Sequence, residues 1–172
     1  MKPLDCIIMT EVKLTENDLP YAEKAEHYCA MEEHCTSAVR AKLLTWGASR
    51  EQVDRITDYL VQNDYINEPR YARQYCDSKL RMQKWGRIKM AYHLRAKQLP
   101  KPVIETAIEG LDEVLYSSVL RELAEGKWEQ LKGEENPMKR KGKLVTFLAS
   151  KGFEMDEIQE TIQSLTNIDI KA

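Results

Sequence analysis

Apolar side chains recur every three to four residues along most of the chain, the spacing of one buried face of an α-helix. The clearest stretch lies at residues 79–111. The first helix predicted there has four apolar positions on one arc: Ile88, Met90, Ala91 and Leu94. Two prolines, Pro100 and Pro102, then interrupt the pattern, because proline lacks the amide donor that a continuing helix needs. A second helix follows with its own apolar stripe: Val103, Ile104, Ala107, Ile108 and Leu111.

This pair of helices occurs three times. Three sets of apolar residues take corresponding positions: Val39, Met90 and Leu144; Leu43, Leu94 and Leu148; Val53, Ile104 and Ile158. Gly47, Gln98 and Gly152 stand where the first helix of each pair ends, and a further helix precedes each pair. The sequence therefore predicts an all-α protein, with three tandem three-helix repeats stacked into an elongated, curved molecule. Its parts are an irregular N-terminal lead at 1–20, repeats at 21–66 and 67–111, and a third repeat with the C-terminal tail at 112–172.

Local signals refine this outline. Ser37 and Ser49 are predicted to be N-caps, because a serine hydroxyl can accept a hydrogen bond from a first-turn amide. Pro69 fits the first turn of a helix, where a missing donor costs little. In that helix four residues are predicted to face inward: Tyr71, Ala72, Tyr75 and Cys76.

The overall composition favours a protein of the cytoplasm. The 172 residues are 42% hydrophobic and 31% charged, and the net charge is −2. No apolar run approaches the roughly 20 residues that span a bilayer, and the first residues lack the pattern of a signal peptide. We therefore expect no membrane partner, with either Met1 or Met9 as the start of translation.

The charges are segregated. Basic residues gather between 67 and 101 and again at 139–143, whereas acidic residues gather at 11–33 and 105–135. Lys and Arg neutralise phosphates whatever the base sequence, so basic helix faces predict a nucleic-acid surface. The alternative is that they are merely solvated faces. The candidate binding residues are Arg70, Arg73, Arg81, Lys84, Arg87, Lys89, Lys97, Lys139, Arg140, Lys141 and Lys143.

The sequence gives little sign of a disulfide, a metal site or a catalytic motif. The four cysteines form no C-x-x-C pair, so reduced thiols are expected. A metal site at His27, Cys29, His34 and Cys35 is disfavoured, because one helix cannot make all four converge. No phosphate-binding loop, nucleophile elbow or zinc-protease motif occurs. We therefore expect neither an enzyme nor a cofactor. Three classes remain open: a regulator that binds nucleic acid, a helix-turn-helix protein of another pathway, and an unrecognised helical enzyme.

Four segments resemble, in order and spacing, the motifs of the RecX family of bacterial recombination regulators: Ile66-Asn67-Glu68, Tyr71-Ala72, Trp85-Gly86-Arg87-Ile88 and Leu94-Arg95-Ala96-Lys97-Gln98-Leu99. The segment Lys151-Gly152-Phe153 fits as well. Three residues depart from the family pattern: His34 replaces arginine, Glu68 aspartate and Gln98 glycine.

The resemblance implies an elongated helical protein without enzymatic activity. It implies a monomer that lies in the groove of the RecA filament, contacts single-stranded DNA and modulates the recombinase, usually by inhibiting it. Double-stranded DNA, bound independently of sequence, is a further expected partner. The family has no catalytic residues to transfer to this chain.

Overall fold

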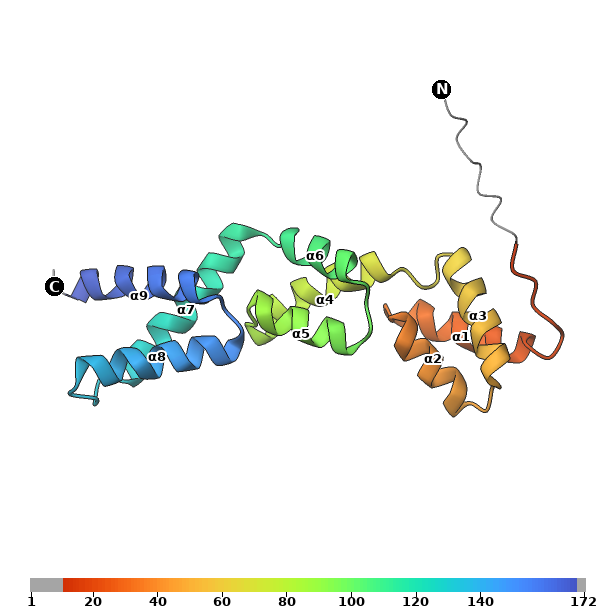
Figure 1. Ribbon diagram of the computed structural model, residues 1–172, viewed down its shortest axis with the longest axis horizontal. Helices are drawn as coiled ribbons and strands as arrows, with labels where there is room; N and C mark the ends of the chain where they lie inside the picture. Colours follow the sequence, from red (N-terminus) through yellow and green to blue (C-terminus); the bar gives the residue numbers. More distant parts are fainter. Residues whose placement is uncertain (1–10, 170–172) are drawn as a thin grey trace, which may run out of the picture. The chain divides into compact units, whose positions relative to one another are not determined.

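The computed structural model describes residues 11–169, and all regular secondary structure within that range is helical. The chain divides into two compact units, Met1–Glu68 and Pro69–Ala172, which are described separately below. Figure 1 shows the succession of helices, which form three groups of three. The predicted fold class, all-helical with three-helix repeats, is therefore confirmed. The first half of the predicted N-terminal lead at 1–20 lies outside the described residues; residues 11–18 are irregular as predicted, and α1 begins at Leu19, so the last two residues of the predicted lead are helical.

The first unit packs three helices around one small core. They are α1 (Leu19–Met31), α2 (Thr36–Thr45) and α3 (Arg50–Gln62). The core residues come from all three helices and include Ala22, Ala25, Val39, Leu43, Val53, Ile56 and Leu60. Ser49 caps α3 as predicted: its hydroxyl accepts a hydrogen bond from the amide of Gln52, and the side-chain oxygen of Gln52 accepts one from the amide of Ser49.

The prediction that Ser37 is an N-cap is wrong. The N-cap of α2 is Cys35, two residues earlier, and no side-chain hydrogen bond caps this helix. Cys35 is fully buried, and its carbonyl accepts hydrogen bonds from the amides of Ala38 and Val39. The start of α2 therefore lies two residues before the expected serine cap.

The second unit contains two groups of three helices. The first group is α4 (Glu68–Gln83), α5 (Arg87–Ala96) and α6 (Lys101–Glu109). The second is α7 (Glu113–Gln130), α8 (Pro137–Lys151) and α9 (Met155–Asp169), in which each helix packs against the other two. Asp112 and Asn136 cap α7 and α8 through their side-chain oxygens.

The repeat positions inferred from sequence form equivalent parts of the cores. Leu43, Leu94 and Leu148 are fully buried in their respective groups. The two other sets of three are also buried, none more than 3% exposed: Val39, Met90, Leu144, Val53, Ile104 and Ile158.

Within two residues of the end of each of the corresponding helices α2, α5 and α8, one residue turns the chain in the left-handed conformation. Its φ is 96° at Gly47, 66° at Gln98 and 91° at Gly152. Gln98 thus adopts the backbone of the glycines to which it corresponds, at the steric cost of a side chain in that region.

A backbone junction joins the two groups of the second unit. The amides of Gly86 and Ile88 donate to the carbonyls of Lys151 (2.9 Å) and Gly152 (3.0 Å). Amides at the start of α5 thus meet carbonyls at the end of α8, groups that neither helix can satisfy by itself. A Cβ at position 86 would lie only 2.2 Å from the Gly152 carbonyl oxygen, so glycine is required. The junction fixes α5 against the end of α8.

Candidate nucleic-acid interface

Aromatic rings and lysines alternate on one surface of α4 and α5. We call this surface the aromatic–basic strip, and it comprises Tyr71, Tyr75, Lys79, Trp85, Lys89, Tyr92, His93 and Lys97. The Nζ atom of Lys79 lies 5.2 Å from the ring of Tyr75 and 5.1 Å from that of Trp85. Lys89 Nζ lies 4.9 Å from the Trp85 ring, and Lys97 Nζ lies 6.0 Å from the rings of Tyr71 and Tyr75. Each of these lysines is within cation–π range of an aromatic side chain.

The rings are themselves in contact. Trp85 and His93 stack with centroids 4.6 Å apart, and Tyr92 meets His93 edge to face at 5.5 Å. Tyr92 is 66% exposed, which is unusual for so large an aromatic residue. The strip therefore exposes the ring of Tyr92 to solvent, and the stacked pair of His93 and Trp85 connects that ring to Lys79 and Lys89.

The prediction that Tyr71 and Tyr75 face the core is wrong in part. Ala72, Cys76 and Leu80 are fully buried, but the two tyrosines are only half-buried. The buried stripe of α4 is narrow because it is built on one residue per turn, and the tyrosines flank it on the side of the strip. Their rings lie 5.9 Å apart.

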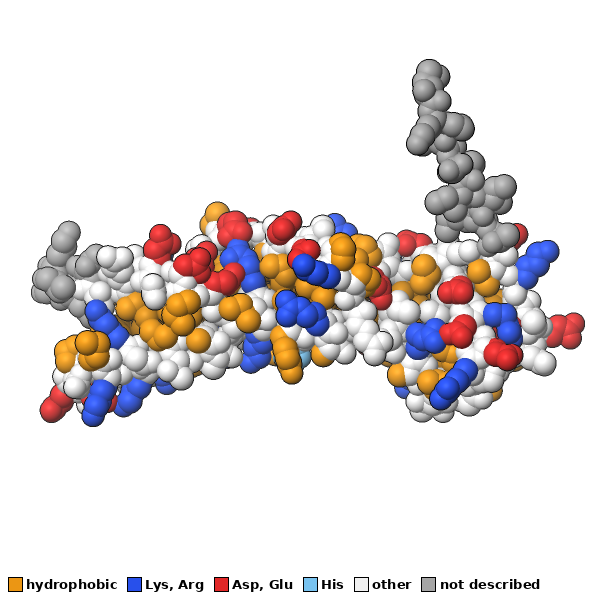
Figure 2. Space-filling model, in the orientation of Figure 1, with side chains coloured by type: hydrophobic (Ala, Val, Ile, Leu, Met, Phe, Trp, Pro, Cys, Tyr) orange, Lys and Arg blue, Asp and Glu red, His pale blue; other side chains and the backbone are white. Residues whose placement is uncertain are grey.

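The basic cluster at the start of α8 contains two exposed lysines and two residues that contact other parts of the chain. Lys139 and Lys141 are exposed. The guanidinium of Arg140 lies 3.6 Å from the centroid of the Trp128 ring and donates a hydrogen bond to the Trp128 carbonyl oxygen. Lys143 pairs with Glu134 at 2.6 Å, and this pairing lowers the pKa of the Glu134 carboxyl. Figure 2 shows Lys and Arg side chains along the edge of the molecule at α8.

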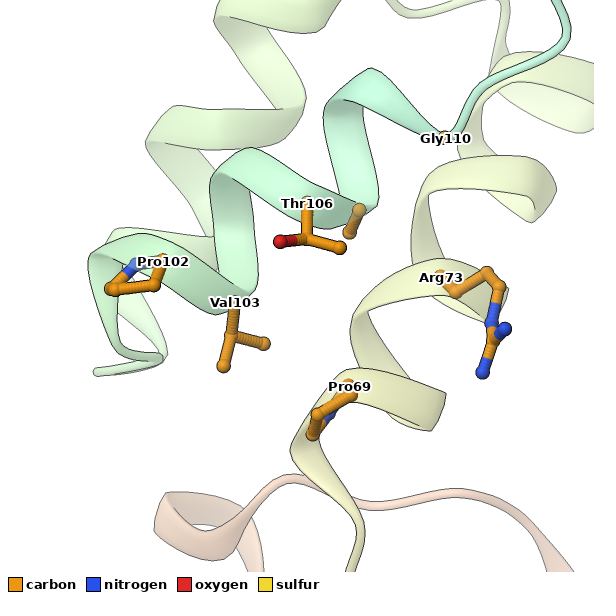
Figure 3. Close-up of a pocket in the computed structure, with 7 residues that line it drawn as sticks. Pro69, Arg73, Pro102, Val103, Thr106 and Gly110 are labelled. Carbon is orange, nitrogen blue, oxygen red and sulfur yellow. The ribbon is translucent and has the colours of Figure 1, made fainter. Parts of the chain in front are cut away.

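The candidates on α4 are similarly divided. Arg81 forms an ion pair with Asp77 on its own helix, and Lys84 pairs with Glu122 of α7 at 2.5 Å. Arg70 is half-buried. Arg73 is exposed and lines a groove between α4 and α6 (Figure 3). Arg73 therefore lies outside the aromatic–basic strip.

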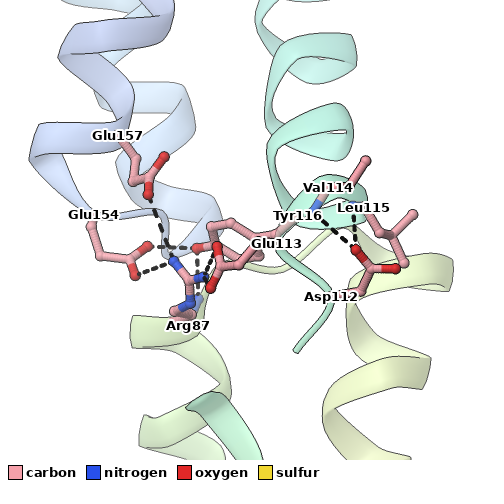
Figure 4. Close-up of polar contacts among 8 residues, drawn as sticks. All are labelled: Arg87, Asp112, Glu113, Val114, Leu115, Tyr116, Glu154 and Glu157. Atoms are coloured by element: carbon pink, nitrogen blue, oxygen red, sulfur yellow. Dashed lines mark hydrogen bonds and ion pairs between the residues drawn. The ribbon is translucent and has the colours of Figure 1, made fainter. Parts of the chain in front are cut away.

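Arg87 is largely buried in a cluster of carboxylates at the junction, as Figure 4 shows. Its side chain is only 16% exposed. Its Nη atoms lie 2.5 Å from Glu113, 3.1 Å from Glu154 and 3.8 Å from Glu157. The guanidinium also covers the ring of Tyr116, 3.9 Å from its centroid. Three carboxylates therefore engage the guanidinium of Arg87, which the sequence analysis placed among the candidate nucleic-acid-binding residues.

Tyr116 completes this cluster. Its hydroxyl donates to Glu154 at 2.5 Å and accepts a hydrogen bond from the Arg87 amide at 3.1 Å. Burial, and then the bond to Glu154, raise the pKa of Tyr116 far above its usual range. The phenol therefore remains a hydrogen-bond donor at any physiological pH and holds α7 to both neighbouring elements.

The structure places the candidate residues in two separate groups. Lys89 and Lys97 belong to the strip, and Lys89 Nζ also reaches the carbonyl oxygen of Ser150 at the end of α8 (3.3 Å). Lys139 and Lys141 lie near the other end of α8, roughly 15 Å away along the helix axis at 1.5 Å per residue.

The candidate basic residues named from the sequence did not include Lys79. A signal for Lys79 was available, because it follows Tyr75 by one helical turn and so shares its face.

The remaining expectations concern metals, thiols and membranes. Within residues 11–169 no three His, Cys, Asp or Glu side chains are placed to hold a metal ion. Cys29, Cys35 and Cys76 are free thiols, and Cys6 lies outside the described residues. Burial raises the pKa of both Cys29 and Cys76 to about 11. Among the described helices, none is both long and apolar enough to cross a bilayer.

Comparison with known proteins identifies both groups of the second unit. Residues 67–108 match the family model described as RecX, second three-helix domain, and residues 116–162 match RecX, third three-helix domain. The regulatory protein RecX of Chlorobium limicola is 30% identical to this chain over 138 residues, which cover 79% of the chain and 83% of that protein. The RecX protein of Prosthecochloris aestuarii is 28% identical over 142 residues, covering 83% and 91%.

Other RecX proteins are longer than the matched region. The match to the Clostridium tetani protein, at 29% identity, covers 72% of this chain but 57% of that protein. The fold also agrees with a solved structure. The crystal structure of RecX from Lactobacillus salivarius superimposes with a TM-score of 0.80, covering 89% of this chain and 99% of that one at 22% identity.

Proposed function

Because the chain belongs to the RecX family of regulatory proteins, we propose that it binds the filament of RecA recombinase on single-stranded DNA and inhibits its ATPase and strand-exchange activities. The relatives named above are regulatory proteins, in agreement with the prediction of a regulator and not an enzyme. In this proposal the protein acts as a monomer in the cytoplasm, where RecA and DNA are found.

The observation that carries the proposal is the aromatic–basic strip. Lysines neutralise phosphates without reading base sequence. Aromatic rings stack on unpaired bases of any identity, at about 1–3 kcal/mol per base. Tyr92 is the exposed ring of the strip, and Lys79 and Lys89 lie over the ring of Trp85 nearby in the same strip. A surface with both features suits a single strand better than a duplex, whose bases are stacked on one another.

A second contact is provided by Lys139 and Lys141, and the junction fixes where it lies. The hydrogen bonds of Gly86 and Ile88 to the end of α8 hold that helix at a set position relative to the strip. The two basic groups therefore face their ligand as a rigid pair. A pair of fixed contacts restricts the ligand to a defined path and loses less entropy on binding than two mobile contacts.

Inhibition would follow from occupying the filament groove. A protein that contacts the DNA and also successive recombinase subunits opposes any rearrangement of those subunits. In this proposal each subunit must rearrange to hydrolyse ATP or exchange strands. The acidic helix α7 is a candidate for protein contacts, because Glu125 is exposed on it and the exposed Glu122 and Glu129 form only surface ion pairs, with Lys84 and Lys132.

Binding of a labelled single strand at several salt concentrations tests the surface. Lys79→Glu should weaken binding and reduce the slope of log K against log [salt] by about 0.7 per lost phosphate contact. Tyr92→Ala should cost about 1–3 kcal/mol of binding free energy with little change in the slope. The matched control is Arg121→Glu, an exposed charge reversal on α7 that should change neither quantity.

Two results would contradict the proposed surface. One is wild-type binding that does not depend on salt. The other is unchanged affinity in both strip variants. A strong preference for one duplex sequence would instead favour the helix-turn-helix alternative.

A further inference from the structure

A groove of about 460 Å³ lies between α4 and α6, within the second unit. Its walls are mostly apolar, with Pro69 on α4 facing Pro102, Val103 and Ala107 on α6. Figure 3 shows Val103 and Thr106 projecting from α6 and Arg73 extending from α4. The volume falls in the range of pockets that bind small ligands or single side chains of a partner.

The groove and the aromatic–basic strip use different sides of α4. Tyr71, Tyr75 and Lys79 are four residues apart and share one face. Arg73 follows Tyr71 by two residues, which rotates it by about 200° around the helix, away from that face. A ligand in the groove therefore does not compete with nucleic acid on the strip. The second unit can hold two partners at once.

The chemistry of the lining indicates what the groove binds. Its apolar walls are filled best by an apolar side chain. Arg73 is the only charged residue among the lining side chains, and a guanidinium binds a carboxylate through two parallel hydrogen bonds. Apart from Arg73 the lining offers no cation to a phosphate backbone, which would need one for each phosphate that it buries. The lining thus favours a protein segment over a second stretch of nucleic acid.

We propose that this groove docks a segment of the recombinase in which an apolar side chain lies beside an aspartate or glutamate. The inference rests on the proposed function, which requires a protein contact in addition to the DNA contact. It assigns Arg73, first considered as a DNA ligand, to protein recognition. The DNA contact and the protein contact then lie on different faces of one helix.

The test compares two affinities for each variant: for a single strand alone, and for a filament of RecA on that strand, held with a non-hydrolysable ATP analogue. Thr106→Trp fills the groove from an exposed position. It should weaken filament binding at least tenfold and leave single-strand binding within twofold. Arg73→Gln should weaken filament binding three- to tenfold. Gln159→Trp, at an exposed site on α9, is the control and should behave as the wild type.

Each other outcome has a distinct meaning. If Thr106→Trp binds the filament as the wild type does, the groove proposal is wrong while the proposed function stands. If it loses single-strand affinity equally, the groove belongs to the DNA surface and the proposal is also wrong. A dimeric wild type that becomes monomeric in Thr106→Trp would show that a second copy fills the groove. If the wild-type protein does not bind the filament, both the proposed function and the recombinase as the partner of the groove are wrong. Circular dichroism establishes that each variant is folded.

Discussion

Removing the charge of Arg87 should destabilise the second unit, because this residue holds the junction between its two helix groups. Arg87→Met keeps much of the side-chain volume and removes the guanidinium. The substitution leaves Glu154 and Glu157 close together without their common cation, and both are mostly buried, at 26% and 33% exposed. Breaking a buried ion pair by removing one partner costs about 3–5 kcal/mol.

The expected loss is smaller than that full range. Glu113 is 67% exposed, so water can solvate its carboxylate once the arginine is gone. Glu154 retains its hydrogen bond from Tyr116. We therefore expect Arg87→Met to lower the free energy of unfolding by about 2–3 kcal/mol, at or just below the lower limit of the buried-pair range. For a unit of this size that corresponds to a decrease in Tm of about 10 °C.

Denaturation followed by tryptophan fluorescence measures this loss. Trp85 and Trp128 lie in the second unit, and Trp46→Phe removes the signal of the first. Arg121→Met serves as the control, since Arg121 is exposed on α7. A change below about 0.5 kcal/mol in Arg87→Met, the usual range for surface substitutions, would refute the reasoning that this arginine holds the two groups together.

Four other predictions concern separate parts of the molecule. The hydrogen bond from Arg55 outweighs burial and lowers the pKa of Asp18. The stabilisation from this pair is therefore complete above the ordinary aspartate pKa of about 3.9 and is lost as the pH falls below it. Denaturation measured across this pH range should show the loss in the wild type and not in Asp18→Asn. Gln98→Gly should raise stability by about 1 kcal/mol in urea denaturation, because it relieves a left-handed residue. Lys139→Glu with Lys141→Glu should weaken single-strand binding and flatten its salt dependence, as titrations at several ionic strengths would show. Small-angle scattering should report an elongated particle; a near-spherical envelope would contradict the stacking of three repeats.

The cores were predictable because they depend on local periodicity. The spacing that placed Leu43, Leu94 and Leu148 at corresponding positions is set by the helix repeat, and all three are buried. The left-handed turns at Gly47 and Gly152 followed from glycine after an apolar stripe. Periodicity identifies which face of a helix is buried, and those predictions required nothing else.

The junction was not predictable in the same way. Arg87 lies on a polar part of its own helix, and its partners Glu113 and Glu154 follow it by 26 and 67 residues. Helical periodicity carries no information about which distant carboxylates approach an exposed-looking arginine. Only the packing of α7 and α9 against the start of α5 shows that Arg87 is a structural residue.

The sequence predicted which kinds of residue form the candidate site, but not which of them contact one another. The sequence indicated that basic residues gather between 67 and 101, a range that includes α4 and α5. It did not show that Lys79 and Lys89 converge on the ring of Trp85, because they come from different helices. The groove at Arg73 was likewise missed, since a concave surface between helices has no signature along the chain.

The most direct test of the central claim is the rate of ATP hydrolysis by RecA from the same organism on single-stranded DNA, measured as this protein is titrated in. The account predicts that the rate falls at or below stoichiometric amounts relative to RecA, and that excess free DNA does not fully restore it. It also predicts that Lys79→Glu combined with Tyr92→Ala inhibits much less than the wild type, while Arg121→Glu inhibits equally well. An ATPase rate that is unchanged at a several-fold excess of the wild-type protein would contradict the claim.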